Sequence, residues 1–220
     1  MERKRRGRGL RAVGVGLALG LAAAAVWPAP AAPDGRERLA QLQKAGPAEH
    51  KAALEAGGKL ARFCANCHDG TRAGEFAEVP KLAGQNPLYL LGQLEAFRSG
   101  RRSGTFMQGL ARALSADEQA RIALFYAAQP VTPALPESGP RAAEGREHFI
   151  RNCQRCHGAA ARGSEHFPRL AGQQPEYLRR NLLRFLGNPA ERSYPPMTSA
   201  VTALGERNIE AVVAYLSSLK

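Results

Sequence analysis

RFCANCHDG, residues 62–70, and RNCQRCHGA, residues 151–159, share a Cys-x-x-Cys-His pattern and together contain every cysteine of the chain. The similarity extends beyond the cysteines, because VPKLAGQNPLYLLGQLEAFRSG (79–100) matches FPRLAGQQPEYLRRNLLRFLGN (167–188) at an offset of 88 residues. Further along, LSADEQARIALFYAAQ matches LGERNIEAVVAYLSSL. The sequence therefore contains one structural unit that occurs twice.

Each unit is predicted to be helical, with a helix that ends at the cysteine motif, a middle helix and a terminal helix. Ser115 and Glu118 form a capping-box pattern at the start of the first terminal helix. The second terminal helix has apolar residues at the spacing of one helix face: Ile209, Val212, Val213 and Leu216. Aromatic residues make up 6% of the chain and long β-branched runs are absent, which disfavours a sheet. We expect an all-α fold with two tandem domains.

The composition divides the chain into five ranges. Residues 1–32 combine a basic start, an apolar run of 16 residues and a small-residue stretch, which is typical of an export signal. The apolar run is shorter than the roughly 20 residues that span a bilayer, and an uncleaved N-terminal anchor is the alternative. The other ranges are a charged N-terminal extension (33–56), a first domain (57–128), a Pro-rich linker (129–142) and a second domain (143–220).

The formal charge of +12 falls to +7 without the signal, because that segment holds six Lys or Arg residues and one Glu. The basic residues are not interleaved with aromatic ones as in a nucleic-acid surface, so we expect no nucleic-acid partner. Residues 140–220 carry five of the seven remaining net charges. The count predicts that an acidic redox partner docks on the second domain, near Arg179, Arg180 and Arg184.

The paired cysteines have several possible roles. Disulfides suit an exported protein but leave the adjacent histidines unexplained. Zinc sites of two Cys-x-x-Cys pairs usually have roughly 15 to 20 residues between the pairs, whereas 85 residues separate them here. A thioredoxin-like redox pair needs a βαβ pattern, which is missing. Cys-x-x-Cys-His is also the attachment signature of covalent haem. We therefore predict two covalently bound haem c groups, attached at Cys64 with Cys67 and at Cys153 with Cys156.

Two histidine–methionine pairs are the candidate axial ligands of the two irons. His68 and His157 end the attachment motifs, and Met107 and Met197 follow them by 39 and 40 residues. A single methionine is usually a flexible core filler. Here the only two methionines after the initiator occupy equivalent places, which favours ligation. A thioether ligand raises the reduction potential of a haem iron.

Two prolines are candidates for the next layer around the iron. A ligating imidazole normally donates its second ring N–H to an acceptor, which fixes the ring. Pro80 and Pro168 follow the two histidines by 12 and 11 residues, so their carbonyls are plausible acceptors. The alternative is that both are ordinary loop prolines.

The combined pattern resembles the dihaem cytochrome c4 family over about residues 57–220. The motifs that carry the resemblance are CANCH and CQRCH, PKLAGQNPLYL and PRLAGQQPEYL, TFMQGL and YPPMTS, and LSADEQARIALFYAAQ. The resemblance implies two class I cytochrome c domains related by a pseudo-twofold axis, with His/Met ligation in both. It also implies a periplasmic electron carrier that serves a terminal oxidase, with an upstream donor such as a quinol-oxidising cytochrome complex.

The leading functional hypothesis is an electron carrier, because two protein ligands close both axial positions of each iron. The alternative is the electron-accepting cytochrome subunit of a periplasmic dehydrogenase, such as a flavoprotein sulfide dehydrogenase. A dihaem peroxidase or thiosulfate-oxidising enzyme would need an open, His or Cys sixth ligand. Two methionines and the lack of a spare cysteine argue against that class. Membrane association would require an uncleaved N-terminus.

Overall fold

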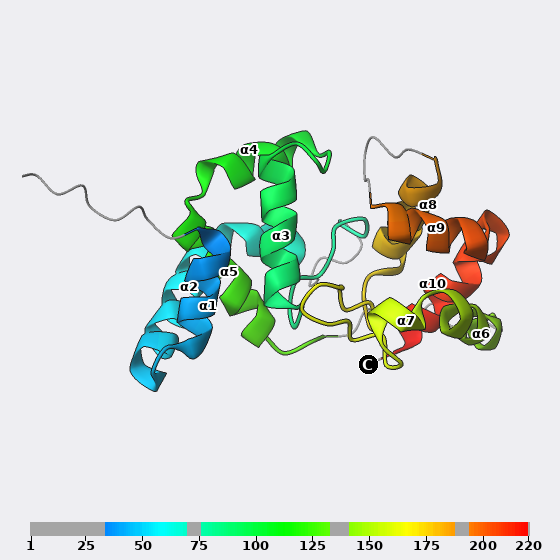
Figure 1. Ribbon diagram of the computed structural model, residues 1–220, viewed down its shortest axis with the longest axis horizontal. Helices are drawn as coiled ribbons and strands as arrows, with labels where there is room; N and C mark the ends of the chain where they lie inside the picture. The colour runs from blue at the N-terminus through cyan, green and yellow to red at the C-terminus, as the bar shows by residue number, and fades with distance from the viewer. Residues whose placement is uncertain (1–33, 70–75, 133–140, 188–193, 220) are drawn as a thin grey trace, which may run out of the picture. The chain divides into compact units, whose positions relative to one another are not determined.

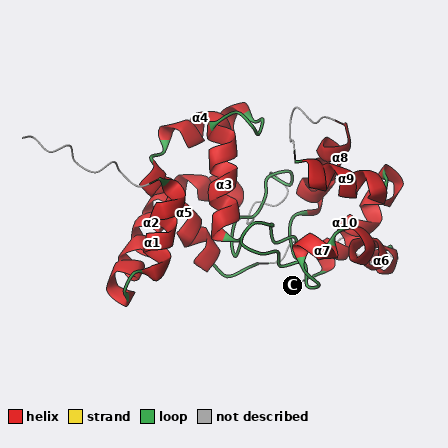
Figure 2. Ribbon diagram, in the orientation of Figure 1, coloured by secondary structure: helices red, strands yellow, loops and turns green. Residues whose placement is uncertain are grey.

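The computed structural model describes residues 34–69, 76–132, 141–187 and 194–219. These residues form ten α-helices, one short 3-10 helix and no β-strand (Figures 1 and 2). The all-α prediction is thus confirmed. The predicted export signal and most of the predicted linker lie outside the described residues. Within the described part of the chain, no helix is both long and apolar enough to cross a membrane.

We call residues 34–132 the first repeat and residues 141–219 the second repeat. The first repeat contains α1 (Gly35–Lys44), α2 (Pro47–His68), α3 (Pro87–Arg98), α4 (Thr105–Ala113) and α5 (Ala116–Ala128). The second repeat contains α6 (Ala142–Asn152), α7 (Gln154–His157), α8 (Pro175–Gly187), α9 (Pro195–Leu204), the 3-10 helix η1 (Glu206–Asn208) and α10 (Ile209–Ser218). Apart from α1, the two repeats follow the same order of helices (Figure 1).

In both repeats the helix that leads into the cysteine motif packs on the terminal helix at a glycine. Gly57 of α2 faces the backbone carbonyl of Arg121, and Gly145 of α6 faces the carbonyl of Ala211. A Cβ atom at either glycine would overlap the facing carbonyl. The two helices of each pair therefore approach closely at the glycine. Through this contact, the helix that carries each attachment motif packs against the core of its repeat.

Each repeat has its own hydrophobic core. In the first repeat the buried residues come from α1, α2, α3 and α5, and they include Leu39, Leu42, Leu91, Ile122 and Tyr126. In the second repeat they come mainly from α6, α8, α9 and α10, and they include Phe149, Leu182, Val201, Val213 and Leu216. The predicted capping box at the start of α5 is present, with both Ser115 and Glu118 side chains hydrogen-bonded to backbone amides.

The predicted N-terminal extension supplies α1 and the first half of α2. Leu39 and Leu42 of α1 are fully buried in the first core. The Arg38 guanidinium lies 2.6 Å from the carboxylate of Asp117 at the start of α5. Helix α1 is therefore packed as an integral part of the first repeat.

The surface that α1 covers in the first repeat has a different composition at the equivalent positions of the second repeat. Leu91 and Ala120 are fully buried in the first repeat, and Leu91 lies against Gly35 of α1. The equivalent positions of the second repeat are Arg179 and Glu210, which form a bidentate salt bridge with two contacts of 2.7 Å. An ion pair at this position can face water, whereas two apolar residues need a cover. This difference explains why only the first repeat requires an additional helix.

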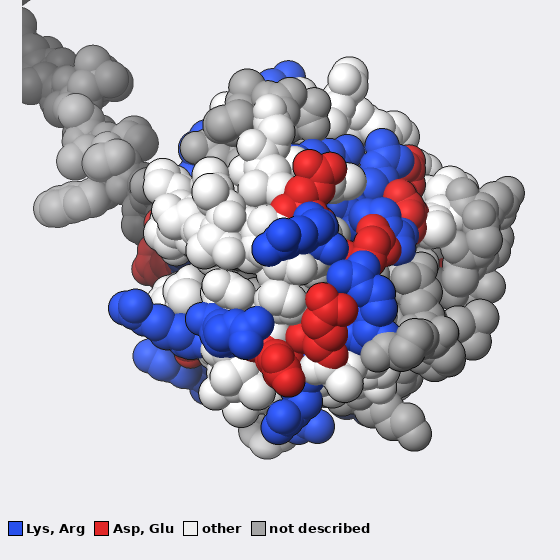
Figure 3. Space-filling view, turned by 90° about the vertical axis from the view of Figure 1, so that its right-hand side faces the viewer, with Lys and Arg blue, Asp and Glu red and all other residues white. Residues whose placement is uncertain are grey.

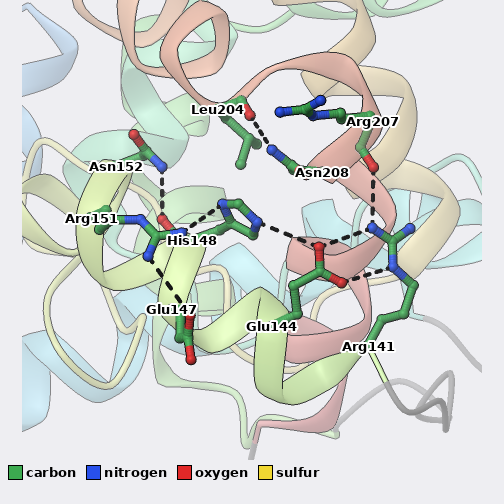
Figure 4. Close-up of polar contacts among 9 residues, drawn as sticks. All are labelled: Arg141, Glu144, Glu147, His148, Arg151, Asn152, Leu204, Arg207 and Asn208. Atoms are coloured by element: carbon green, nitrogen blue, oxygen red, sulfur yellow. Dashed lines mark hydrogen bonds and ion pairs between the residues drawn. The ribbon is translucent and has the colours of Figure 1, made fainter.

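The second attachment motif is entered through a broken helix. Helix α2 runs without interruption to His68, whereas α6 ends at Asn152 and α7 begins at Gln154. The Asn152 side-chain amide donates to the backbone carbonyl of His148 at 3.0 Å (Figure 4). Side-chain hydrogen bonds of this kind compete with the helical backbone. The first repeat has Phe63 at the equivalent position, which cannot make such a bond.

Candidate haem-binding sites

The four predicted attachment cysteines lie on the helical segments that end at the motif histidines. Cys64 and Cys67 occupy the last two turns of α2, and Cys153 and Cys156 flank the start of α7. All four thiols are half-buried and unpaired, so neither motif forms a disulfide. Burial raises the pKa of Cys64, and it raises the pKa of Cys153 to about 11. These two thiols are thus neutral at pH 7.

The two motif histidines make the same hydrogen bond. The Nδ1 atom of His68 lies 2.8 Å from the carbonyl oxygen of Pro80, and that of His157 lies 3.0 Å from the carbonyl oxygen of Pro168. A carbonyl only accepts hydrogen bonds, so Nδ1 carries the proton and Nε2 keeps its lone pair. Burial lowers the pKa of both histidines, which favours the neutral ring. Each imidazole is therefore oriented and protonated as a metal ligand requires.

The two candidate methionine ligands occupy the same place in equivalent helices. Met107 is the third residue of α4, and Met197 is the third residue of α9. Both side chains are half-buried. Met197 also packs against the core of the second repeat. The repeated sequence thus places one thioether near the start of the helix that precedes each terminal helix.

Two glutamines join the loops that carry the prolines. The Gln85 side chain accepts from the backbone amide of Arg169 at 2.7 Å and donates to the Arg169 carbonyl at 3.0 Å. The Gln173 side chain does the same with the amide and carbonyl of Lys81, at 2.9 and 3.0 Å. Lys81 and Arg169 directly follow Pro80 and Pro168. Each glutamine thus holds the other repeat's backbone next to the carbonyl that orients the histidine.

The neighbouring residues extend this connection. Asn86 donates its side-chain amide to the carbonyl of Phe167 at 2.9 Å, and Gln174 donates to the carbonyl of Val79 at 2.7 Å. Phe167 and Val79 precede the two loop prolines. The loops that orient the two histidines are therefore tied to each other by reciprocal side-chain to backbone hydrogen bonds. Such reciprocity is what a pseudo-twofold axis between the repeats requires.

The sequence alone does not predict a role for these side-chain amides, although both of them belong to a repeated stretch. The stretch LAGQ occurs at 82–85 and again at 170–173, each time followed by Asn or Gln. A polar residue repeated next to a ligand loop indicates a shared structural role. The repeat pattern does not reveal that its partner lies in the other unit, because hydrogen bonds of this kind depend on how the units pack.

The arginines that the charge count selected for docking are occupied by other groups. Arg179 binds Glu176 and Glu210, each at 2.7 Å, and Arg180 forms an ion pair with Glu78. Figure 3 shows the right-hand side of the view in Figure 1, where blue basic side chains lie beside red acidic ones. Two of the three arginines on which the charge count places the docking face are therefore already bound by carboxylates of the same chain.

The described residues fit a covalently bound haem in both repeats. Each repeat has two unpaired thiols on consecutive helical turns and a neighbouring histidine with its Nδ1 anchored and its Nε2 available. A structural zinc site would instead use four ligands that converge on one point. No group of three or more His, Cys, Asp or Glu residues converges in this way in the described ranges.

Comparison with known proteins identifies relatives with the same organisation. A family model described as Cytochrome c matches residues 142–220. Cytochrome c4 from Thiocapsa roseopersicina is 34% identical over 172 residues, which cover 71% of this chain and 86% of that protein. A thiosulfate dehydrogenase electron acceptor from Stutzerimonas stutzeri is 33% identical over 72% of this chain and 80% of its own length.

A solved structure shows the same fold. The crystal structure of reduced recombinant cytochrome c4 from Pseudomonas stutzeri is 27% identical and aligns with a TM-score of 0.66, over 76% of this chain and 98% of that chain. The aligned share is too large for a single cytochrome c domain and therefore includes both repeats. Together with the helical order, the two attachment motifs and the family match, this similarity supports the predicted architecture of two tandem cytochrome c domains. The chain therefore belongs to the cytochrome c4 family, and it is a c-type cytochrome that carries electrons through covalently bound haem c.

Proposed function

We propose that the protein carries single electrons through two haem c groups, one in each repeat. The observation that carries this proposal is that both repeats present the same set of donor groups, with each histidine anchored through Nδ1 to a proline carbonyl. We assign Cys64 and Cys67 to the first group. Cys153 and Cys156 hold the second group. Residues 57–128 and 143–220 are the proposed haem domains, and α1 with the first half of α2 is packed onto the first.

We assign His68 with Met107, and His157 with Met197, as the axial ligands of the two irons. A bound haem iron supplies a one-electron couple between its ferrous and ferric states. Pro80 and Pro168 hold the imidazole rings in one orientation through their carbonyl oxygens. Fixed ligands keep the geometry similar in both oxidation states, so little reorganisation accompanies electron transfer. A closed coordination sphere leaves no position for a substrate.

The proposed place of action is the periplasm, because residues 1–32 have the pattern of an export signal. Cleavage would release a soluble protein, and retention of the segment would attach it to the membrane. We propose a terminal oxidase as the electron acceptor and a quinol-oxidising cytochrome complex as the donor. Membership of the cytochrome c4 family supports redox partners of this kind.

A second candidate is the electron acceptor of a periplasmic dehydrogenase. The relative from Stutzerimonas stutzeri, at 33% identity, is named as the electron acceptor of thiosulfate dehydrogenase. This relative favours a thiosulfate-oxidising enzyme over a flavoprotein sulfide dehydrogenase as the electron donor. In both roles the chain transfers electrons, and the donor differs.

Two measurements test the proposal. Mass spectrometry of the denatured holoprotein should show the mature chain plus two haem masses, and a gain of one or none would contradict it. Purification from the native membrane and periplasm should then recover an oxidase or quinol-oxidising complex. Recovery of a thiosulfate-oxidising enzyme would instead support the second candidate.

A further inference from the structure

Two large aromatic side chains lie in solvent beside the first haem-binding motif. Phe63 immediately precedes Cys64 on α2, and Phe106 immediately precedes Met107 on α4. Their rings stack with centroids 6.4 Å apart, yet 57% of Phe63 and 67% of Phe106 remain exposed. They are the most exposed of the large hydrophobic residues in the described ranges. An exposed aromatic pair is costly in water and is typical of a surface that another molecule covers.

The segments that carry this pair have an unusually one-sided charge. Residues 56–68 and 96–115 contain six basic residues and no acidic one: Lys59, Arg62, Arg98, Arg101, Arg102 and Arg112. Except for the half-buried Arg102, all of these side chains are exposed, and none forms an ion pair with a described residue. Arg112 Nε donates to the backbone carbonyl of Arg98 at 3.3 Å, which holds the cations of α3 and α4 together. We call Phe63, Phe106 and these five exposed cations the aromatic–basic patch.

The described residues of the second repeat form no equivalent surface. Asn152 and Pro196 replace the two phenylalanines. The matching segments, 145–157 and 184–205, contain five basic residues and two glutamates. One of those basic residues, Arg151, lies 3.7 Å from Glu147 and also contacts His148 (Figure 4). The net charge near the attachment motif and its methionine is thus +6 in the first repeat and +3 in the second.

We propose that the aromatic–basic patch is the surface on which this cytochrome docks the acidic face of a redox partner protein. The partner is a protein with carboxylates around an apolar centre, and electrons pass to or from it through the first repeat. This inference rests on the proposed function as an electron carrier. It places the docking site on the opposite repeat from the one that the total charge of each half suggests.

The two parts of the patch have different physical roles. Exposed cations steer an acidic partner and raise the association rate, and salt weakens this effect. Buried aromatic side chains at the centre of an interface slow dissociation, and salt has little influence on them. Among the described residues these cations have no ion-pair partner, so they can act on the redox partner without first breaking such a pair. The aromatic pair lies next to the ligand-bearing segments, which keeps the transfer distance short.

The test uses the holoprotein and flavodoxin, a small acidic electron-transfer protein. Binding of oxidised flavodoxin to the oxidised cytochrome is measured by calorimetry, and reduction by flavodoxin hydroquinone is measured by stopped flow. R62E/R101E should slow the bimolecular reaction about tenfold at low ionic strength, with the difference lost near 0.5 M salt. F63S/F106S should weaken binding about tenfold at every salt concentration.

Matched variants of the second repeat serve as controls. R146E/R155E changes the charge by the same amount, and I150S/Y194S removes two other exposed apolar side chains. Both should change rate and affinity less than about twofold. Equal effects from the two repeats would overturn the proposal. If F63S/F106S leaves flavodoxin binding unchanged but turns a dimer into a monomer in sedimentation, the patch binds a second copy and the proposal is wrong.

A separate measurement distinguishes this inference from the proposed function. Reductive titration with dithionite should take up two electrons per chain in every variant. If the patch variants bind and react with flavodoxin like the unaltered protein while the titration still shows two electrons, the docking inference is wrong. The proposed function as an electron carrier is then unaffected. A titration of fewer than two electrons in the unaltered protein would contradict the proposed function itself.

Discussion

Gln85 and Gln173 make the same two hydrogen bonds to opposite repeats, each to the amide and the carbonyl of the residue that follows a histidine-orienting proline. A primary amide has a donor and an acceptor side by side, so it can pair with a backbone residue as a neighbouring strand would. The two histidine loops are therefore fixed to each other. The packing of the repeats and the orientation of the imidazole rings depend on the same few residues.

Replacing one of these glutamines should weaken the contact between the repeats. Gln173→Leu removes the two hydrogen bonds to the amide and carbonyl of half-buried Lys81, so we expect a loss of about 2 kcal/mol in the free energy of unfolding. Denaturant titration measures it, and hydrogen exchange at the Lys81 amide should become faster. Gln129→Leu is the control, because the Gln129 side chain donates to the carbonyl of Phe125 within the same repeat. Equal losses of unfolding free energy in the two variants would show that the hydrogen bonds between the repeats contribute no more to stability than a bond within one repeat.

The glycine at each helix crossing should tolerate no side chain. Gly145→Ala places a methyl group against the carbonyl of Ala211, and we expect a destabilisation of about 3 kcal/mol or more. Gly109→Ala is the control, since Gly109 lies in the middle of α4 with open space around it. There alanine should stabilise the protein by up to about 1 kcal/mol. Thermal unfolding of the two variants should therefore shift in opposite directions.

Helix α1 should contribute substantially to the stability of the first repeat. Leu39→Ala and Leu42→Ala remove fully buried side chains, and each should cost about 2 to 5 kcal/mol. Leu183→Ala, at an exposed position of α8, should cost less than about 1 kcal/mol. Chemical denaturation compares the three. A small effect at both α1 leucines would mean that the N-terminal extension is dispensable for the first core.

The attachment of α1 should weaken in acid. Hydrogen bonds from Arg121, and then from Arg38, lower the pKa of Asp117 below its ordinary value of 3.8. A carboxyl with a lowered native pKa stabilises the fold above its unfolded pKa, and this stabilisation is lost as the pH falls through the native value. Asp117 is 45% exposed, so the contribution is small. Asp117→Asn should be less stable than the unaltered protein at pH 7 and equally stable near pH 2, as denaturant midpoints would show.

Each candidate methionine ligand should affect one haem only. Met107→Ala or Met197→Ala should remove half of the methionine-to-iron charge-transfer absorbance, lower one reduction potential and open that iron to small ligands such as cyanide. The double variant should lose the whole band. Leu110→Ala, on the same helix as Met107, is a control for altered packing and should keep both bands. An unchanged spectrum in either single variant would exclude that methionine as a ligand.

Much of the fold could be predicted because the information is local or repeated. The cysteine motifs, the capping box at Ser115 and the apolar stripe of α10 each depend on residues within a few turns of one another. Because the unit is duplicated, each motif residue of one repeat has a counterpart in the other. The pairing of surface charges could not be predicted by counting them, because a sum over residues does not show that Arg179 binds Glu210.

The sequence by itself determined the helical class, the two repeats and the set of thiols, imidazoles and thioethers, since covalent chemistry and helix periodicity need only residue type and spacing. Only the tertiary structure decided which groups meet across the repeats and which surface charges remain unpaired. Those relationships join residues far apart in the chain, such as Gln85 and Arg169. They follow from how two preformed helical units bury their loops against each other, and no local pattern encodes that packing.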